Sequence, residues 1–137
     1  MRVGTRFIAT AESGAHPAYK DALISARAGE TEISAAFSVL CPLCAQRPRA
    51  RVLSSALAAA QALKSDVVGD MNLEGQQVAL PKFAGLPPHR DVAGHVEAMA
   101  LYAGDSVDGV TAVTTASEVI HELADGAERA ERLLRAW

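Results

Sequence analysis

The chain has 137 residues and a mass of 14.3 kDa, a length typical of one domain. Half of the residues are hydrophobic, but 28 of these are alanines, so we expect a thin core. The 16 acidic residues outnumber the 13 lysines and arginines without any dense basic block, which argues against a nucleic-acid partner. No apolar run approaches the roughly 18 residues of a membrane span, and the first residues lack the layout of a secretion signal. We therefore expect a soluble, cytoplasmic chain that makes no contact with a membrane.

The first predicted element is a strand over residues 2–10, which contain a short apolar run. After a Ser-Gly break, Pro17 begins a predicted helix that stops at Gly29. Residues 30–47 show no clear period and are predicted to be irregular.

A second helix is predicted from Pro48, because apolar residues recur there at helical spacing. The stripe consists of Leu53, Ala56, Leu57, Ala60 and Leu63. Short apolar pieces between residues 66 and 83 flank a turn signal at residues 72–75, which predicts a turn or a small hairpin. Residues 85–91, which include two prolines, are predicted to be an extended loop.

Two more helices complete the prediction. Asp91 is expected to cap a third helix that carries an apolar face and ends at Gly104. Thr115 and Glu118 have the spacing of a capping box, which predicts the start of a last, amphipathic helix. The predicted chain is thus one strand, several helices and long loops, an unusual inventory for a self-contained domain.

Two short motifs carry chemistry with open alternatives. Gly4 and Thr5 would let the backbone approach an anion and offer amide and hydroxyl donors to a phosphate, or they form an ordinary turn. Cys41 and Cys44 have the spacing of a thioredoxin-type redox pair or of half a zinc site. The four histidines are scattered and not paired at ligand spacing, so two inert, reduced thiols are favoured.

The remaining candidates favour structural roles. His121 lies between Glu118 and Glu122 on a helix face typical of solvated surface, and His16 precedes a proline as a loop or cap residue would. Residues 101–107 are typical of a glycine helix stop followed by a turn.

Four segments, in order and spread over most of the chain, carry a family resemblance. They are residues 4–10 with 12–13 and 16–20, residues 51–55, residues 86–88 with 90–91, and residues 97–107. This set resembles the carboxy-terminal part of the nitronate monooxygenases, formerly called 2-nitropropane dioxygenases, which are FMN-dependent oxidoreductases with a TIM-barrel fold.

The resemblance implies an α/β fold class, with the chain as the C-terminal fragment of an FMN-binding TIM barrel. Residues 1–30 would supply the last barrel strand, a phosphate loop and a helix, and residues 31–137 a mostly helical cap subdomain. It implies that Gly4, Thr5 and Arg6 bind the FMN phosphate, as phosphate sites after strands 7 and 8 do in other barrels. It places Tyr102 and Gly104 on the substrate side of the flavin. No metal is implied.

The implied activity is the oxidation of an alkyl nitronate by FMN and then by O2, which yields a carbonyl compound and nitrite. None of the four histidines matches the family's proton-abstracting histidine, and Cys41 stands near a position where the family has tryptophan. Because a TIM barrel takes about 250 residues, we expect a truncated piece that is inactive alone. The alternatives are a small non-catalytic helical domain and a redox or zinc-binding module at the cysteine pair.

Overall fold

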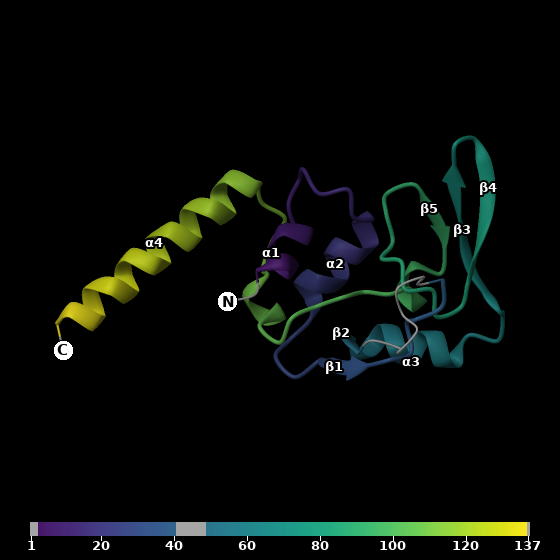
Figure 1. Ribbon diagram of the computed structural model, residues 1–137, viewed down its shortest axis with the longest axis horizontal. Coiled ribbons are helices and arrows are strands. Elements are labelled where there is room, and N and C mark those ends of the chain that lie inside the picture. Colours follow the sequence, from purple (N-terminus) through teal and green to yellow (C-terminus); the bar gives the residue numbers. More distant parts are fainter. Residues whose placement is uncertain (1–2, 41–48, 137) are drawn as a thin grey trace.

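The computed structural model describes residues 3–40 and 49–136 and has a mixed α/β fold. Figure 1 shows a body that contains two small antiparallel sheets and the helices α1 to α3, and a long helix, α4, that extends away from this body. The strands within the described residues do not close into a barrel.

The chain begins with a short helix, α1 (Gly4–Ile8), so the predicted strand over residues 2–10 is wrong. The amide groups of Arg6 and Phe7 donate to the carbonyl oxygen of Val3 at 3.1 and 3.4 Å, which closes a helical turn. An apolar run forms a strand only where a neighbouring strand receives its hydrogen bonds. In the described residues this segment has no more than a single bridge, between Thr10 and Thr114.

Helix α2 (Pro17–Ser25) confirms the predicted helix and its start at Pro17, but it ends at Ser25, before the predicted stop at Gly29. His16 Nδ1 accepts the amide hydrogen of Ala18 at 3.1 Å, so this histidine is the cap residue that the sequence indicated. Tyr19 and Leu23 bury one face of the helix against the body.

A two-stranded antiparallel sheet pairs β1 (Thr31–Ser34) with β2 (Ala50–Leu53). The region predicted to be irregular therefore contains a strand. Helix α3 (Ser54–Ala62) follows β2 directly, so the second helix begins later than predicted, and the expected start at Pro48 lies outside the described residues. The predicted stripe is confirmed at its centre, where Ala56, Leu57 and Ala60 are buried.

A three-stranded antiparallel sheet has the order β4-β3-β5. Strands β3 (Val67–Leu73) and β4 (Gln76–Pro81) form the predicted hairpin, and the side-chain oxygen of Asn72 accepts the amide hydrogen of Gly75 at 2.8 Å in its turn. Residues Val92–Gly94 form β5, so this sheet occupies part of the region predicted as the third helix.

The predicted third helix is wrong because the backbone at Gly94 cannot continue one. Gly94 has a φ of 120°, a conformation that side-chain-bearing residues rarely adopt, and it lies opposite Gly69 of β3. A Cβ added to Gly69 would lie 2.1 Å from the carbonyl oxygen of Ala93, so both glycines permit a close approach of the strands. Two single-turn 3-10 helices, η1 (Val96–Ala98) and η2 (Val107–Gly109), follow β5.

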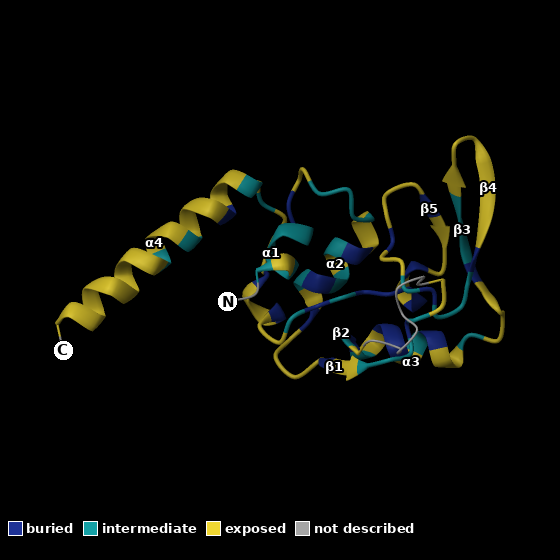
Figure 2. Cartoon of the chain, viewed as in Figure 1, coloured by how far each residue is buried: buried dark blue, intermediate teal, exposed yellow. Residues whose placement is uncertain are grey.

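The core consists of two hydrophobic clusters. One contains Leu57 and Ala60 of α3 with Val68, Leu80 and Val92 of the three-stranded sheet. The other contains Tyr19 and Leu23 of α2 with Leu53, Leu101 and Val107. Figure 2 shows that buried residues are concentrated in the body, whereas α4 is almost entirely exposed.

Helix α4 (Ala116–Arg135) confirms both the predicted last helix and its capping box. The side chain of Thr115 accepts the amide hydrogen of Glu118 at 3.2 Å, and the Glu118 carboxylate accepts the amide hydrogen of Thr115 at 2.8 Å. Of its described residues, Val119 alone is buried. The helix is therefore attached to the body near its start.

Candidate functional site

A cleft of about 780 Å³ opens between α1, the two-stranded sheet and the segment that precedes η2. Its lining comes from Gly4, Thr5 and Ile8, from Ile33, from residues 49–51 and from residues 102–106. This volume lies within the range of about 300 to 1,000 Å³ that is usual for ligand sites.

Backbone hydrogen bonds fix the wall of the cleft that contains Tyr102 and Gly104. The amide of Leu53 donates to the carbonyl oxygen of Leu101 at 2.9 Å, and the amide of Ala103 donates to the carbonyl oxygen of Arg51 at 3.1 Å. This segment thus runs beside β2 and is not the helix end that the sequence indicated. At its far end the amide of Gly104 donates to Thr5 Oγ1 at 2.8 Å, which ties the segment to α1.

The cleft has a cationic side. Arg49 and Arg51 line it, and Asp105 is the one carboxylate among the lining residues that the structure describes. The Arg51 guanidinium lies 3.3 Å from Asp105 Oδ1 and donates to Thr31 Oγ1 at 3.1 Å. Because the described lining contains two arginines and one carboxylate, the cleft carries an excess of positive charge that favours an anion.

The structure brings together four of the five residues that the sequence singled out. Gly4, Thr5, Tyr102 and Gly104 all line this cleft, although the two pairs lie far apart in the sequence. Arg6 does not join them. Its guanidinium lies 2.5 Å from Glu122 of α4, and its amide already donates to Val3.

Sequence reasoning missed Arg49, Arg51 and Asp105. Arg51 begins one of the matched segments and Asp105 belongs to another, but no local pattern indicated that the two would meet. Their pairing depends on the segment at residues 101–105 running beside β2, a non-local contact.

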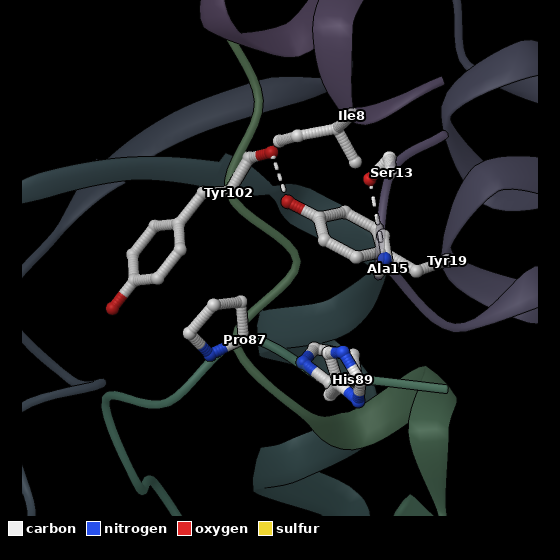
Figure 3. Close-up of a pocket in the computed structure, with 9 residues that line it drawn as sticks. Ile8, Ser13, Ala15, Tyr19, Pro87, His89 and Tyr102 are labelled. Atoms are coloured by element: carbon white, nitrogen blue, oxygen red, sulfur yellow. Dashed lines mark hydrogen bonds between the residues drawn. The ribbon is translucent and has the colours of Figure 1, made fainter. Parts of the chain in front are cut away.

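A second cavity of about 300 Å³ lies next to the cleft, and Tyr19 and Tyr102 are among its lining residues. The Tyr19 hydroxyl donates to the carbonyl oxygen of Tyr102 at 2.6 Å (Figure 3). The Tyr102 hydroxyl donates to the carbonyl oxygen of Gly85 at 2.9 Å. Burial raises the pKa of both hydroxyl groups above the ordinary value of 10, so both rings stay uncharged. Tyr102 and Ile8 line both the cleft and the second cavity.

The remaining titratable candidates that the structure describes form no metal site. In residues 3–40 and 49–136, no group of three or more His, Cys, Asp or Glu side chains is placed to hold a metal ion. His121 is exposed on α4, as the solvated-face interpretation predicts. Cys41 and Cys44 lie outside the described residues, so inert thiols, a redox pair and a zinc site all stay predictions.

Comparison of the chain with protein-family models, with curated proteins and with solved structures found no match. In the parts of the chain that the structure describes, every helix is too short or too polar to span a bilayer.

Proposed function

We propose that this chain is part of an FMN-dependent oxidoreductase of the nitronate monooxygenase type, and that the cleft beside α1 holds the phosphate end of FMN. One observation carries the proposal. Gly4 and Thr5, which the resemblance gives to the cofactor, and Tyr102 and Gly104, which it gives to the substrate side, line the same cleft. The hydrogen bond from Gly104 to Thr5 joins the two sets directly.

The residues that line the cleft suit the binding of a phosphate group. A Cβ added to Gly4 would meet no atom within 4 Å, so there is open space beside the backbone at this point. Arg49 and Arg51 supply the guanidinium groups that bind phosphate oxygens well, and Thr5 supplies a hydroxyl group. In this proposal Arg6 pairs with Glu122 of α4 and does not contact the cofactor.

When bound, FMN would accept electrons from an alkyl nitronate and pass them to O2. In this proposal the residues of the cleft bind and orient the cofactor. Their side chains offer little means to move a proton. Among the described residues that line the cleft there is no histidine, and their one carboxylate, Asp105, is paired with Arg51. The resemblance placed the last barrel strand in residues 1–30, where the structure has helices α1 and α2. In the proposal, the described residues therefore follow the last barrel strand, and the proton-abstracting group comes from another part of the enzyme. We therefore expect no turnover from this chain alone.

Flavin titration tests the phosphate site. We expect FMN to bind at least about tenfold more tightly than riboflavin, which lacks the phosphate, since one or two charge-assisted hydrogen bonds give a difference of this order. The measurement is quenching of flavin fluorescence at low salt. Equal affinity for the two flavins, or no binding of FMN, would refute the phosphate assignment.

Charge variants sharpen this test, because their effects have opposite signs. Arg49→Gln should weaken FMN binding, whereas Asp105→Asn should strengthen it by removing the competing carboxylate beside Arg51. Neither change should alter riboflavin binding. Arg129→Gln, which removes the same charge from the exposed α4, is the matched control and should leave both affinities unchanged.

A turnover assay tests the second part of the proposal. The purified chain, supplied with excess FMN and propyl-2-nitronate, should release no nitrite above the level of free FMN. Rapid nitrite release would show that this chain holds a complete catalytic site, while leaving the type of reaction as proposed.

A further inference from the structure

Helix α4 carries an apolar stripe, most of which the body does not cover. Of the described residues of α4, Val119 alone is buried. Ile120 is 56% exposed and Leu134 is 78% exposed, and Figure 2 shows exposed residues along nearly the whole helix. Residues at alternating intervals of four and three lie on one face of a helix. By this spacing the stripe consists of Ile120, Leu123, Ala127, Ala130 and Leu134.

The opposite face of α4 is charged. Glu118, Asp125 and Arg132 follow one another at intervals of seven residues and lie at the centre of that face. A helix that needs no partner can be polar all round, because ion pairs at i,i+4 spacing support it. A narrow stripe of two apolar residues in every seven is typical of a helix that packs against one other helix.

The order of charges along α4 favours one direction for such a partner. Residues 116–125 contain three acidic side chains and no lysine or arginine, which gives this half a charge of −3. Residues 126–135 contain three arginines and two glutamates, which gives that half a charge of +1. A second α4 that runs antiparallel places its positive half beside the negative half of the first, and the two helix dipoles attract each other. A parallel partner would place like charges together.

The side chains of the stripe also suit an antiparallel pair of α4 helices. A two-fold axis between residues 128 and 129 would place Ala127 of one copy opposite Ala130 of the other, and Leu123 opposite Leu134. The two small residues at the centre let the helices approach closely, and the leucines cover both ends of the contact. Leu123 is only half-buried against the body, so part of its side chain remains accessible.

The body leaves room for a second helix in this arrangement. Helix α4 extends away from the body (Figure 1), so an antiparallel pair has its two bodies at opposite ends. A parallel pair would place the two bodies side by side. In the antiparallel register, Arg135 of the second copy lies opposite Glu122 and does not reach Val119, where α4 packs on the body.

We infer that the stripe on α4 binds the α4 of a second copy of this chain in an antiparallel pair. A lipid surface fits the charged face less well, because helices that lie on membranes are rich in lysine and arginine, whereas α4 has five acidic residues and three arginines. The inference goes beyond the proposed function and does not require bound flavin. The contact is short, so we expect a weak dimer with a Kd on the order of 10–100 µM.

Sedimentation equilibrium tests whether the dimer forms. The mass should rise from 14.3 kDa towards twice this value as the concentration passes through the expected Kd. Leu134→Glu should raise the Kd at least about tenfold, because it places a carboxylate in the apolar contact. Leu134 is exposed in the single chain, so this variant should fold normally, which circular dichroism checks. His121→Glu adds the same charge to the opposite face and is the matched control, with an unchanged Kd.

Spin labels test the direction of the pair. Cys41→Ser and Cys44→Ser first remove the other thiols, and a label is then attached at Arg129→Cys or at Arg135→Cys. In the antiparallel pair the labels at position 129 lie near the two-fold axis, whereas those at position 135 are separated by about 20 Å along the helix axis. Dipolar spectroscopy above the Kd should therefore give a longer distance for position 135. Similar distances at both positions would show a parallel pair and overturn the inference.

Three further results would overturn it. They are a chain that stays monomeric up to about 1 mM, well above the expected Kd, a dimer that Leu134→Glu does not weaken, and a monomer that sediments with phosphatidylcholine vesicles. The last result would assign the stripe to a lipid surface. Leu134 does not line the cleft, so Leu134→Glu should leave FMN binding unchanged. A failure of dimerisation and a failure of the flavin proposal are therefore distinguishable.

Discussion

Helices α3 and α4 are stabilised in opposite ways. Helix α3 has nine residues and no side-chain cap, but Ala56, Leu57 and Ala60 are buried in the body. Helix α4 has 20 residues, a complete capping box and one buried residue, Val119. Its exposed face carries ion pairs at i,i+4 spacing, between Glu128 and Arg132 and between Glu131 and Arg135.

The comparison separates two sources of helix formation. A nine-residue peptide is too short to be helical by itself in water, so α3 depends on packing against the rest of the body. Helix α4 depends mostly on interactions that lie within its own sequence. Substitutions should therefore have large, global effects in α3 and small, local effects in α4.

The largest effect is expected from Leu57→Ala, which removes a buried side chain of α3. Loss of burial and the resulting cavity should lower the free energy of unfolding by about 2–5 kcal/mol. Urea denaturation measures this change. Leu133→Ala is the matched control, because Leu133 of α4 is 68% exposed and should change stability by less than about 0.5 kcal/mol. Equal effects of the two changes would remove the contrast between the helices.

A smaller effect is expected from Gly94→Ala in the three-stranded sheet. The new Cβ would lie 2.5 Å from the Cα of Gly69, and the φ of 120° is unfavourable for alanine. Together these should cost roughly 1–3 kcal/mol in thermal or urea unfolding. Gly109→Ala offers the comparison, since a Cβ there meets nothing within 4 Å. Equal stability of the two variants would contradict the close approach of β3 and β5 at Gly69 and Gly94.

Thr115→Ala should have a local effect at the start of α4. It removes the hydroxyl group that accepts from the Glu118 amide, and loss of such a cap costs about 1 kcal/mol. Amide hydrogen exchange should quicken in the first turn of α4 and stay unchanged in α3. Faster exchange throughout the body would show that α4 contributes to the stability of the whole chain.

The smallest effect is expected on acidification. Hydrogen bonds from the Thr114 hydroxyl, the Thr115 amide and the Thr115 hydroxyl lower the pKa of Glu118 from 4.5 to about 2. A carboxylate with a lowered pKa stabilises the fold above its ordinary pKa. This contribution is therefore complete above pH 4.5 and is lost as the pH falls from 4.5 towards 2.

Amide exchange in the first turn of α4 measures that loss. Glu118→Gln keeps a side chain that can accept from the Thr115 amide but does not titrate, so its exchange should depend less on pH over this range. The same pH dependence in both proteins would show that other groups control the start of the helix.

The sequence allowed the locally determined elements to be predicted and left the others uncertain. The capping box of α4 and the turn at Gly75 are short-range patterns that were predicted, and His16, predicted as a loop or cap residue, caps α2. Strand β5 was predicted as helix, because its pairing partner, Gly69, lies far away in the sequence. Helix α1 was predicted as a strand for a related reason, since its apolar residues do not show by themselves what they pack against.

The candidate site also has a part that local sequence indicated and a part that depends on contacts between distant segments. Gly4 and Thr5 stood out because their residue types suit an anion, and the structure places them beside an open cleft. The pairing of Arg51 with Asp105 and the small cavity at Tyr19 arise only when distant segments meet, so no sequence pattern indicated them. The FMN assignment itself stays a prediction that flavin titration will decide.

The extension of α4 has a consequence for how the molecule tumbles. A helix of 20 residues is about 30 Å long, close to the diameter of a small domain. Because α4 points away from the body (Figure 1), rotational diffusion should be anisotropic. The N–H bonds of α4 share nearly one direction, so their nitrogen-15 relaxation rates should be uniform along the helix and offset from those of the sheet amides.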